Sequence, residues 1–263
     1  MITLSSDFGW PYPAAMKGVL CSRTDAPLVD VTHEFPRQNV RAAAFWLREV
    51  LPWFPPAVHL VVVDPGVGTD RAALAVRAGD HALVGPDNGV LLPAARRLAA
   101  GAAEGEWEDH ERAVEVFEVA YDAPGSNTFH GRDVFAPAAA RVHEAGIGAV
   151  ESLSGVSPAG EYEDLEFPEV TVEDDGARGE ALVVDGFGNV VTNVPGEVLD
   201  GHYDGPVVVN DAAATAVRAY AGVDPGTRVV TVGSHGNVEL AVNRGRGDRA
   251  FGVEPGDPVR LSW

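Results

Sequence analysis

Residues 60–71 have the sequence Leu-Val-Val-Val-Asp-Pro-Gly-Val-Gly-Thr-Asp-Arg, and this stretch decides the fold class of the first half of the chain. The apolar run 60–63 predicts a buried strand, because it is short and is bounded by turn residues. Asp64 follows at the carboxyl end of this strand, and Gly66 and Gly68 bend the chain before Arg71. Open α/β sheets bind their ligands at the carboxyl ends of strands. The stretch therefore predicts an α/β domain with part of a functional site in this turn.

Strand and helix patterns alternate on both sides of this turn, up to about residue 150. We expect strands over 2–4, 28–31 and 58–63, a hairpin of 72–76 with 82–84, and helices over 12–21, 40–51, 89–100 and 134–144. This alternation predicts a largely parallel central sheet with helices on both faces.

The composition changes after residue 152. Residues 153–169 are rich in Ser, Gly, Pro and Glu, and we expect them to be a linker. Short strands separated by Gly and Asp follow, with no long helix, which is typical of an all-β barrel or sandwich. The predicted organisation is an N-terminal α/β domain (1–152), the linker (153–169) and a C-terminal β-barrel domain (170–263).

The composition also limits the classes of function. The net charge of −20 opposes binding to nucleic acid or to anionic membranes. The only cysteine, Cys21, excludes an intrachain disulfide and a cysteine-built metal site. Residues 1–5 lack the features of a signal peptide, and no apolar run approaches the roughly 20 residues of a membrane helix, so we expect a cytoplasmic protein. Lys17 is the only lysine, and such an acidic, lysine-poor chain leads to the hypothesis of a halophilic protein.

Several glycine-bent turns of the first domain carry polar side chains. Asp7 follows the first strand, Asp64 and Arg71 flank the turn described above, and His130 precedes Gly-Arg-Asp. A paired Asp and Arg can hold a water and keep the carboxylate ionised, and a histidine can hold or move a proton near neutral pH. The structural alternatives are a helix cap for Asp7 or His130 and a loop-closing ion pair for Asp64 with Arg71.

Two segments of the second domain could form a binding surface. In the turn 185–189, Phe187 offers a stacking face and Asn189 offers both a donor and an acceptor. In the segment 234–243, Ser234 and Glu239 could form a polar wall, with Glu239 and Asn243 on one face of a strand. The alternative for 185–189 is a hairpin turn with a packed Phe. No histidine spacing typical of a metal site and no phosphate-binding glycine loop occurs, so we expect neither metal nor cofactor.

The order of these motifs resembles the S-adenosylmethionine hydroxide adenosyltransferases, which are relatives of the bacterial fluorinase and chlorinase. The matching fragments are 7–9, 16–19, 29–34, 63–68, 85–89, 129–137, 185–189 with 192–193, and 234–243. The resemblance implies an α/β domain followed by a β-barrel. It also implies a homotrimer whose sites combine one subunit's N-terminal domain with a neighbour's C-terminal domain.

The resemblance further implies a reaction. Water or hydroxide would attack the ribose 5′ carbon of S-adenosylmethionine and give adenosine and L-methionine. Asp64, Arg71 and His130 would be the catalytic set around the water, and Asp7 would hold the ribose hydroxyls. Asn189, Ser234, Glu239 and the backbone of Val242 would line the adenine and methionine parts of the substrate.

Two alternatives to hydrolysis stay open. The first is a halide-using enzyme that makes 5′-chloro-5′-deoxyadenosine, although the halogenating relatives replace the carboxylate of the Asp-Pro-Gly motif and lack the histidine. The second is a non-catalytic module that binds adenosine or S-adenosylmethionine. The chain also departs from the pattern at Asn39, where many relatives have an aspartate, and in the proline-rich segment 10–13.

Overall fold

The computed structural model describes residues 1–101, 114–121 and 124–263, which form two compact units, Met1–Leu165 and Glu166–Trp263. His110, one of the scattered histidines of the sequence, lies outside the described residues. In the described part of the chain, no helix is long and apolar enough to cross a membrane.

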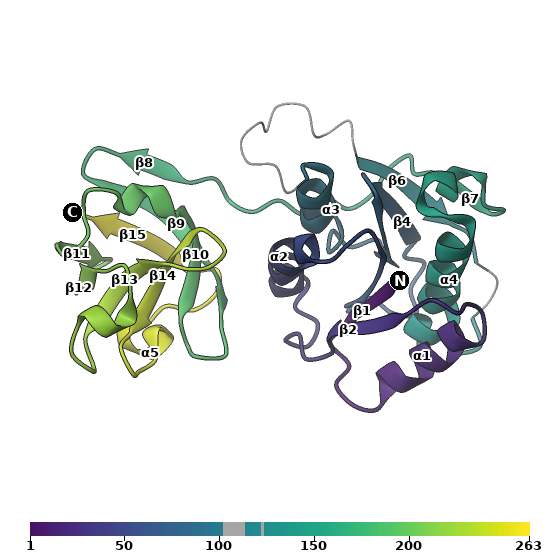
Figure 1. Ribbon diagram of the computed structural model, residues 1–263, viewed down its shortest axis with the longest axis horizontal. Coiled ribbons are helices and arrows are strands. Elements are labelled where there is room, and N and C mark those ends of the chain that lie inside the picture. The colour runs from purple at the N-terminus through teal and green to yellow at the C-terminus, as the bar shows by residue number, and fades with distance from the viewer. Residues whose placement is uncertain (102–113, 122–123) are drawn as a thin grey trace. The chain divides into compact units, whose positions relative to one another are not determined.

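The first unit is built on a seven-stranded sheet with the order β2-β1-β3-β5-β4-β6-β7 (Figure 1). The strands are β1 (Ile2–Ser6), β2 (Leu28–Thr32), β3 (Val58–Val62), β4 (Ala73–Ala78), β5 (His81–Pro86), β6 (Val114–Val119) and β7 (Val156–Pro158). Strands β2, β1, β3 and β5 are parallel, and β4 returns antiparallel to β5 in the predicted hairpin. The predicted α/β fold is confirmed, and β4, β6 and β7 make the far side of the sheet mixed.

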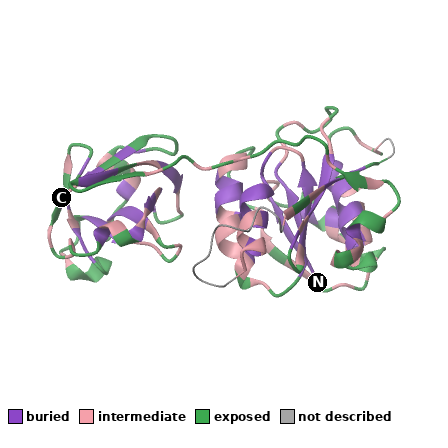
Figure 2. Ribbon diagram, turned by 90° about the horizontal axis from the view of Figure 1, so that it is seen from above, coloured by how far each residue is buried: buried purple, intermediate pink, exposed green. Residues whose placement is uncertain are grey.

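Helices cover both faces of this sheet. Helices α2 (Val40–Val50) and α3 (Leu92–Ala99) pack together on one face, and α1 (Tyr12–Cys21) and α4 (Ala136–Ala145) on the other (Figure 1). This unit also contains the short 3-10 helices η1 (Leu51–Trp53) and η4 (Ile147–Ser152) and the π-helix η3 (Gly131–Phe135). Figure 2 shows that the strands between these layers are mostly buried. Strands β1 and β3 are buried along their whole length, which explains their continuous apolar runs.

Two helices begin at other residues than the sequence predicts. The helix expected over 89–100 begins at Leu92, because Gly89 has a left-handed backbone (φ +84°) that a helix does not allow. The helix expected over 134–144 is preceded by η3, so helical backbone begins directly after His130. The segment 153–169 contains β7, which pairs with β6 and belongs to the first sheet.

A histidine pair lies at the edge of the sheet opposite to the strand ends that carry Asp7 and Asp64. His59 of β3 is fully buried and His81 of β5 is partly buried. His59 Nδ1 lies 2.7 Å from the Thr3 hydroxyl, and its Nε2 lies 2.9 Å from Nδ1 of His81. Burial, together with the charge of His81, lowers the pKa of His59 from 6.5 to about 3.

This pair predicts a loss of stability in acid. Below pH 6.5 His59 becomes protonated in the unfolded chain. In the folded protein it stays neutral until the pH falls to about 3. The free energy of unfolding should therefore fall by about 1.4 kcal/mol per pH unit over this range on account of His59. Urea titrations from pH 7 to pH 4 test this, and the slope should be smaller in His59→Gln. Equal slopes in both proteins would contradict the prediction.

The second unit is a closed β-barrel, as the sequence predicts. Its strands follow the order β10-β14-β13-β12-β11-β15-β9, and β9 pairs back with β10, while β8 extends the sheet beside β9. The strands are β8 (Thr171–Glu173), β9 (Gly176–Val184), β10 (Val190–Pro195), β11 (Pro206–Val209), β12 (Ala212–Ala216), β13 (Arg228–Val232), β14 (Asn237–Val242) and β15 (Pro258–Ser262). The turns η5 (Gly196–Leu199) and η6 (Tyr220–Gly222) and the short helix α5 (Gly247–Phe251) connect them.

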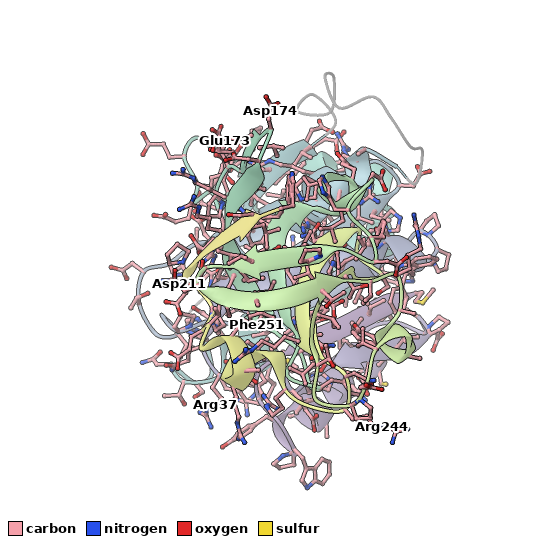
Figure 3. The ribbon with its side chains drawn as sticks, turned by 90° about the vertical axis from the view of Figure 1, so that its left-hand side faces the viewer. Arg37, Glu173, Asp174, Asp211, Arg244 and Phe251 are labelled. Atoms are coloured by element: carbon pink, nitrogen blue, oxygen red, sulfur yellow. The ribbon has the colours of Figure 1, made fainter. Side chains whose placement is uncertain are left out.

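The barrel separates an apolar interior from an acidic surface. Val190, Val230 and Leu240 are among the fully buried residues of its core. Glu173, Asp174 and Asp211 lie on its exposed surface (Figure 3). This distribution places part of the chain's large negative charge in contact with solvent.

Candidate active site

Three neighbouring parallel strands end at the polar turns that the sequence singled out. Ser6 at the end of β1 is in register with Val62 at the end of β3, so Asp7 and Asp64 leave adjacent strand ends. The turn after β5 joins them, because the Asn88 amide donates to the Val63 carbonyl (2.8 Å). The carboxyl edge of the sheet therefore gathers these turns, as the sequence predicts.

Asp64 is the most enclosed carboxylate of this edge. Its side chain is only 5% exposed, and its Oδ1 accepts hydrogen bonds from Arg71 Nη1 (3.3 Å) and from the backbone N–H of Gly66 (3.1 Å). Burial raises the pKa of Asp64, and this outweighs the lowering by Arg71, Gly66 and His130; the charge of Asp7 raises it further. Asp64 is thus a stronger base than an ordinary carboxylate, and the charges of Asp7, Arg71 and His130 all act on it.

Gly66 allows the Arg71 guanidinium to lie against the turn. A Cβ at residue 66 would come within 2.5 Å of Arg71 Nη2 and 2.7 Å of its Cζ. The obstacle is the end of a flexible side chain, so the guanidinium would move and the fold would persist.

Gly66→Ala should therefore lower activity while leaving stability nearly unchanged. The family resemblance places Arg71 in the catalytic set, and a displacement of about 1 Å of a group with such a role can cost up to about 100-fold in rate. The measurement is kcat with the melting temperature beside it. Gly148→Ala is the matched control, because a Cβ there meets nothing within 4 Å. Full activity of Gly66→Ala would show that the position of Arg71 is unimportant.

The turn after Asp64 packs against the loop that leads to His130. Gly68 has a left-handed backbone (φ +83°), and a Cβ there would lie 2.5 Å from the Asn127 carbonyl oxygen. Tyr121 connects the same two segments, since its hydroxyl donates to the Arg71 carbonyl (3.4 Å) and its ring lies edge-on to His130 at 6.0 Å. His130 itself is buried, at 6% exposure. The structure thus brings the predicted Asp64, Arg71 and His130 together.

Asp7 is held by the neighbouring loop, since its Oδ2 accepts a hydrogen bond from the Gln38 N–H (2.6 Å). The rings of Phe8, Tyr12 and Phe129 make mutual edge-on contacts at 5.5–6.2 Å, and Phe8 and Phe129 are the sequence neighbours of Asp7 and His130. Asn39, where many relatives have an aspartate, has a local structural role. Its side chain accepts a hydrogen bond from the Ala42 N–H and caps the N-terminus of α2.

In the second unit, Asn189 and Glu239 belong to one hydrogen-bonded cluster. The Tyr220 hydroxyl donates to Glu239 Oε1 (2.8 Å), and the Asn189 amide lies 3.1 Å from Asp185 Oδ2 and 3.5 Å from the Tyr220 hydroxyl. His235 Nε2 lies 3.5 Å from Glu239 Oε2. Burial would raise the pKa of Glu239, but hydrogen bonds with His235 and Tyr220 prevail and lower it, so Glu239 is ionised at neutral pH.

Sequence reasoning missed two members of this cluster, Tyr220 and His235. Tyr220 lies in the short turn η6, where no periodic pattern marks it. The signal for His235 was present, because it lies within the singled-out segment 234–243 and four residues before Glu239.

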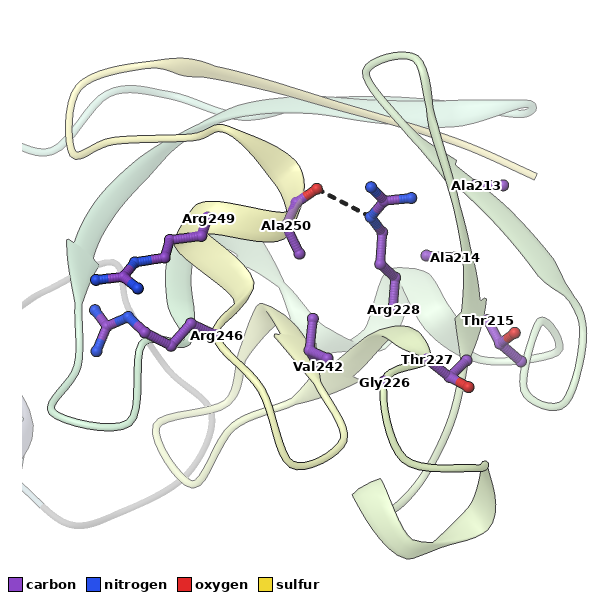
Figure 4. Close-up of a pocket in the computed structure, with 10 residues that line it drawn as sticks. All are labelled: Ala213, Ala214, Thr215, Gly226, Thr227, Arg228, Val242, Arg246, Arg249 and Ala250. Carbon is purple, nitrogen blue, oxygen red and sulfur yellow. Dashed lines mark hydrogen bonds between the residues drawn. The ribbon is translucent and has the colours of Figure 1, made fainter.

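The other predicted residues of this unit lie around the cluster. Phe187 is 81% exposed in the turn after β9, and Ser234 is exposed in the turn between β13 and β14. The Val242 side chain is on the opposite face of β14 from Glu239, by strand alternation. Val242 lines a groove of about 710 Å³ together with Arg228, Arg246 and Arg249 (Figure 4). The Val242 side chain therefore does not reach the Glu239 cluster, and the contact of its backbone with substrate stays a prediction.

The described parts of the chain contain no cluster of three or more His, Cys, Asp or Glu side chains that could hold a metal ion.

Comparison with known proteins assigns the chain to a family. A family model of the SAM hydroxide adenosyltransferase N-terminal domain matches residues 2–152, and the C-terminal domain model matches residues 179–260. The chain belongs to the SAM hydroxide adenosyltransferase family. The two matched domains correspond to the α/β unit and the barrel.

Full-length relatives of the same family support this assignment. A protein of Salinispora tropica named (R)-S-adenosyl-L-methionine hydrolase is 41% identical over 267 residues, which cover 99% of this chain and 97% of that protein. A protein of Thermus thermophilus with the same name is 40% identical and covers 97% of each chain. Among solved structures, an uncharacterized conserved protein from Thermotoga maritima is 32% identical, covers both chains fully and has a TM-score of 0.83.

Proposed function

We propose that this protein hydrolyses S-adenosyl-L-methionine to adenosine and L-methionine. The observation that carries the proposal is Asp64, whose enclosed carboxylate is paired with Arg71 at the carboxyl edge of the sheet, next to the Asp7 turn and the loop of His130. The family and the names of the full-length relatives supply the substrate. Those names specify the (R) form, so we propose the (R) sulfonium epimer as the preferred substrate.

Hydrolysis at the ribose 5′ carbon mainly requires the enzyme to position the attacking water. The sulfonium is an activated leaving group that departs as the thioether of methionine, so no general acid is needed. Asp64 orients a water toward the ribose 5′ carbon and accepts its proton, and burial raises the pKa of Asp64 toward the range of an effective base. Arg71 and His130 hold the nucleophile in line with the C–S bond, where fixed geometry replaces the entropy cost of encounter.

Substrate binding is divided between the predicted residues of the two units. Asp7 accepts hydrogen bonds from the ribose hydroxyls, and Phe187, Asn189, Ser234, Glu239 and the Val242 backbone contact the adenine and methionine parts. We propose a homotrimer in which one subunit's α/β domain and a neighbour's barrel form each site, on the strength of the family resemblance. Light scattering of the purified protein, which should give three times the mass of 27.6 kDa, tests this assembly.

The decisive experiment follows the oxygen of water. Incubation with each sulfonium epimer in ¹⁸O-labelled water and molar KCl, with EDTA present, should give adenosine labelled at the 5′ oxygen, with (R) faster than (S). 5′-Chloro-5′-deoxyadenosine would instead identify a halide adenosyltransferase. Adenosine binding without turnover would identify a binding module. Dependence on added metal would overturn the metal-independent reaction.

We also propose that the protein is halophilic and cytoplasmic. The net charge of −20 implies strong self-repulsion, which salt screens. The midpoint of urea unfolding should therefore rise between 0.1 M and 2 M KCl. Equal midpoints would contradict the halophilic proposal.

A further inference from the structure

Four side chains connect the Asp7 turn to the surface of the first unit, and they are defined here as the His33 network. The Ser6 hydroxyl lies 2.8 Å from His33 Nδ1, and His33 Nε2 lies 3.0 Å from Asp30 Oδ1. Lys17 Nζ donates to Asp30 Oδ2 at 2.5 Å. The network therefore joins α1, β2 and the end of β1, next to Asp7.

The network contains the residue types of a serine hydrolase triad, but its geometry excludes that role. In such a triad the serine faces Nε2 and the carboxylate faces Nδ1. Here the order is reversed, and Ser6 is fully buried. The Ser6 Oγ also accepts from the Phe8 N–H (3.4 Å). Ser6 is thus occupied in holding the turn and has no access to a substrate.

The hydrogen bonds occupy both ring nitrogens of His33. Burial would raise the pKa of Asp30, but hydrogen bonds from Lys17 and His33 prevail and lower it, so Asp30 is ionised. An ionised Asp30 carboxylate is an acceptor only, so it accepts from His33 Nε2–H, while His33 Nδ1 shares a hydrogen bond with the Ser6 hydroxyl. The Ser6 oxygen also accepts from the Phe8 N–H.

The His33 backbone holds the same turn from the other side. Its carbonyl accepts from the Gly9 N–H (2.8 Å), and the Ser6 carbonyl accepts from the Phe35 N–H (3.4 Å). Asp7 lies between these anchor points, and its carboxylate accepts from Gln38 in the loop that continues from His33.

We propose that His33 is a positioning residue, which fixes the Asp7 carboxylate for the ribose hydroxyls by linking Ser6 to the Asp30–Lys17 ion pair. This inference rests on the proposed function, because it takes the ribose contact of Asp7 from there. The side chain of His33 transmits the position of β2 and α1 to the turn, and it touches no substrate atom itself.

The test compares adenosine with 2′,3′-dideoxyadenosine, which lacks the hydroxyls that Asp7 would hold. The wild-type protein should bind adenosine about 10- to 100-fold more tightly in calorimetry, since hydrogen bonds to a charged group contribute about 1.5–3 kcal/mol. His33→Ala should reduce this ratio to within about twofold, with the affinity for dideoxyadenosine unchanged. His33→Asn should restore part of the ratio, because its side-chain amide can take the place of Nδ1 in the hydrogen bond with Ser6.

The controls separate this inference from the proposed function. His143→Ala removes another partly buried histidine of the first unit, at the end of α4, and should leave the ratio unchanged. If His33→Ala does not fold, Asp30→Ala tests the same link at a more exposed position. If a folded His33 or Asp30 variant keeps the wild-type ratio of adenosine to dideoxyadenosine affinity, the positioning role of His33 is wrong, while the proposed function is unaffected. No preference for adenosine in the wild type overturns the ribose role of Asp7 and, with it, this inference.

Discussion

Asp64→Asn should lower kcat by about 100- to 10,000-fold, the usual range for a lost general base. The amide oxygen of asparagine can still accept from Arg71 and from Gly66 N–H, so the turn should keep its structure. The affinity for adenosine should change little, because Asp64 acts on the nucleophile. Single-turnover kinetics and adenosine calorimetry on the same preparation measure the two quantities.

Asp70→Asn is the matched control, because Asp70 lies in the same turn and is exposed. The pH profile adds a second test. The rate of the wild type should fall in acid as Asp64 becomes protonated, with a midpoint above that of an ordinary aspartate, because burial raises its pKa. This acid limb should be absent from the residual activity of Asp64→Asn. An unchanged kcat would remove Asp64 from the mechanism.

The sequence predicted that the Asp7, Asp64 and Arg71 turns would lie together at one edge of the sheet, because these residues follow strand ends. Asp64 and Arg71 share one turn, and the parallel pairing of β1 with β3 in the structure brings Asp7 next to that turn. His130 required tertiary information, since its loop reaches the Asp64 turn through packing between distant segments, such as Gly68 on the Asn127 backbone. The resemblance to a family supplied that information before the structure did.

The hydrogen-bonded cluster of the second unit was harder to predict for a physical reason. The cluster around Glu239 joins residues from a strand, two turns and the segment η6, and none of these contacts follows from a period of 2 or 3.6 residues. The strand β7 was missed for a similar reason: with three residues, it is too short to show alternation. The barrel itself was predictable, because short strands separated by glycine and aspartate recur throughout residues 170–263.

The charge of Glu239 has a second predicted consequence, for affinity and not for the chemical step. Glu239 is buried, at 6% exposure, and Tyr220 and His235 keep its carboxylate ionised, so it is suited to bind a cation. We expect it to hold the ammonium group of the methionine part. Glu239→Gln should raise KM for S-adenosylmethionine by about 10- to 100-fold, since a hydrogen bond between charged groups contributes about 1.5–3 kcal/mol. The value of kcat should change by less than about threefold, because the ammonium is remote from the reacting carbon.

Three comparisons distinguish this role from others. Adenosine should bind Glu239→Gln as tightly as it binds the wild type, whereas weaker adenosine binding would place Glu239 at the adenine. Tyr220→Phe should give a smaller rise in KM at neutral pH and a larger one in acid, because loss of the Tyr220 hydrogen bond lets the pKa of Glu239 rise. Glu197→Gln, at an exposed position of the same unit, should change nothing. A lower kcat with unchanged KM in Glu239→Gln would instead connect this carboxylate to the chemical step. The proposed role of Glu239 in substrate binding alone would then be wrong.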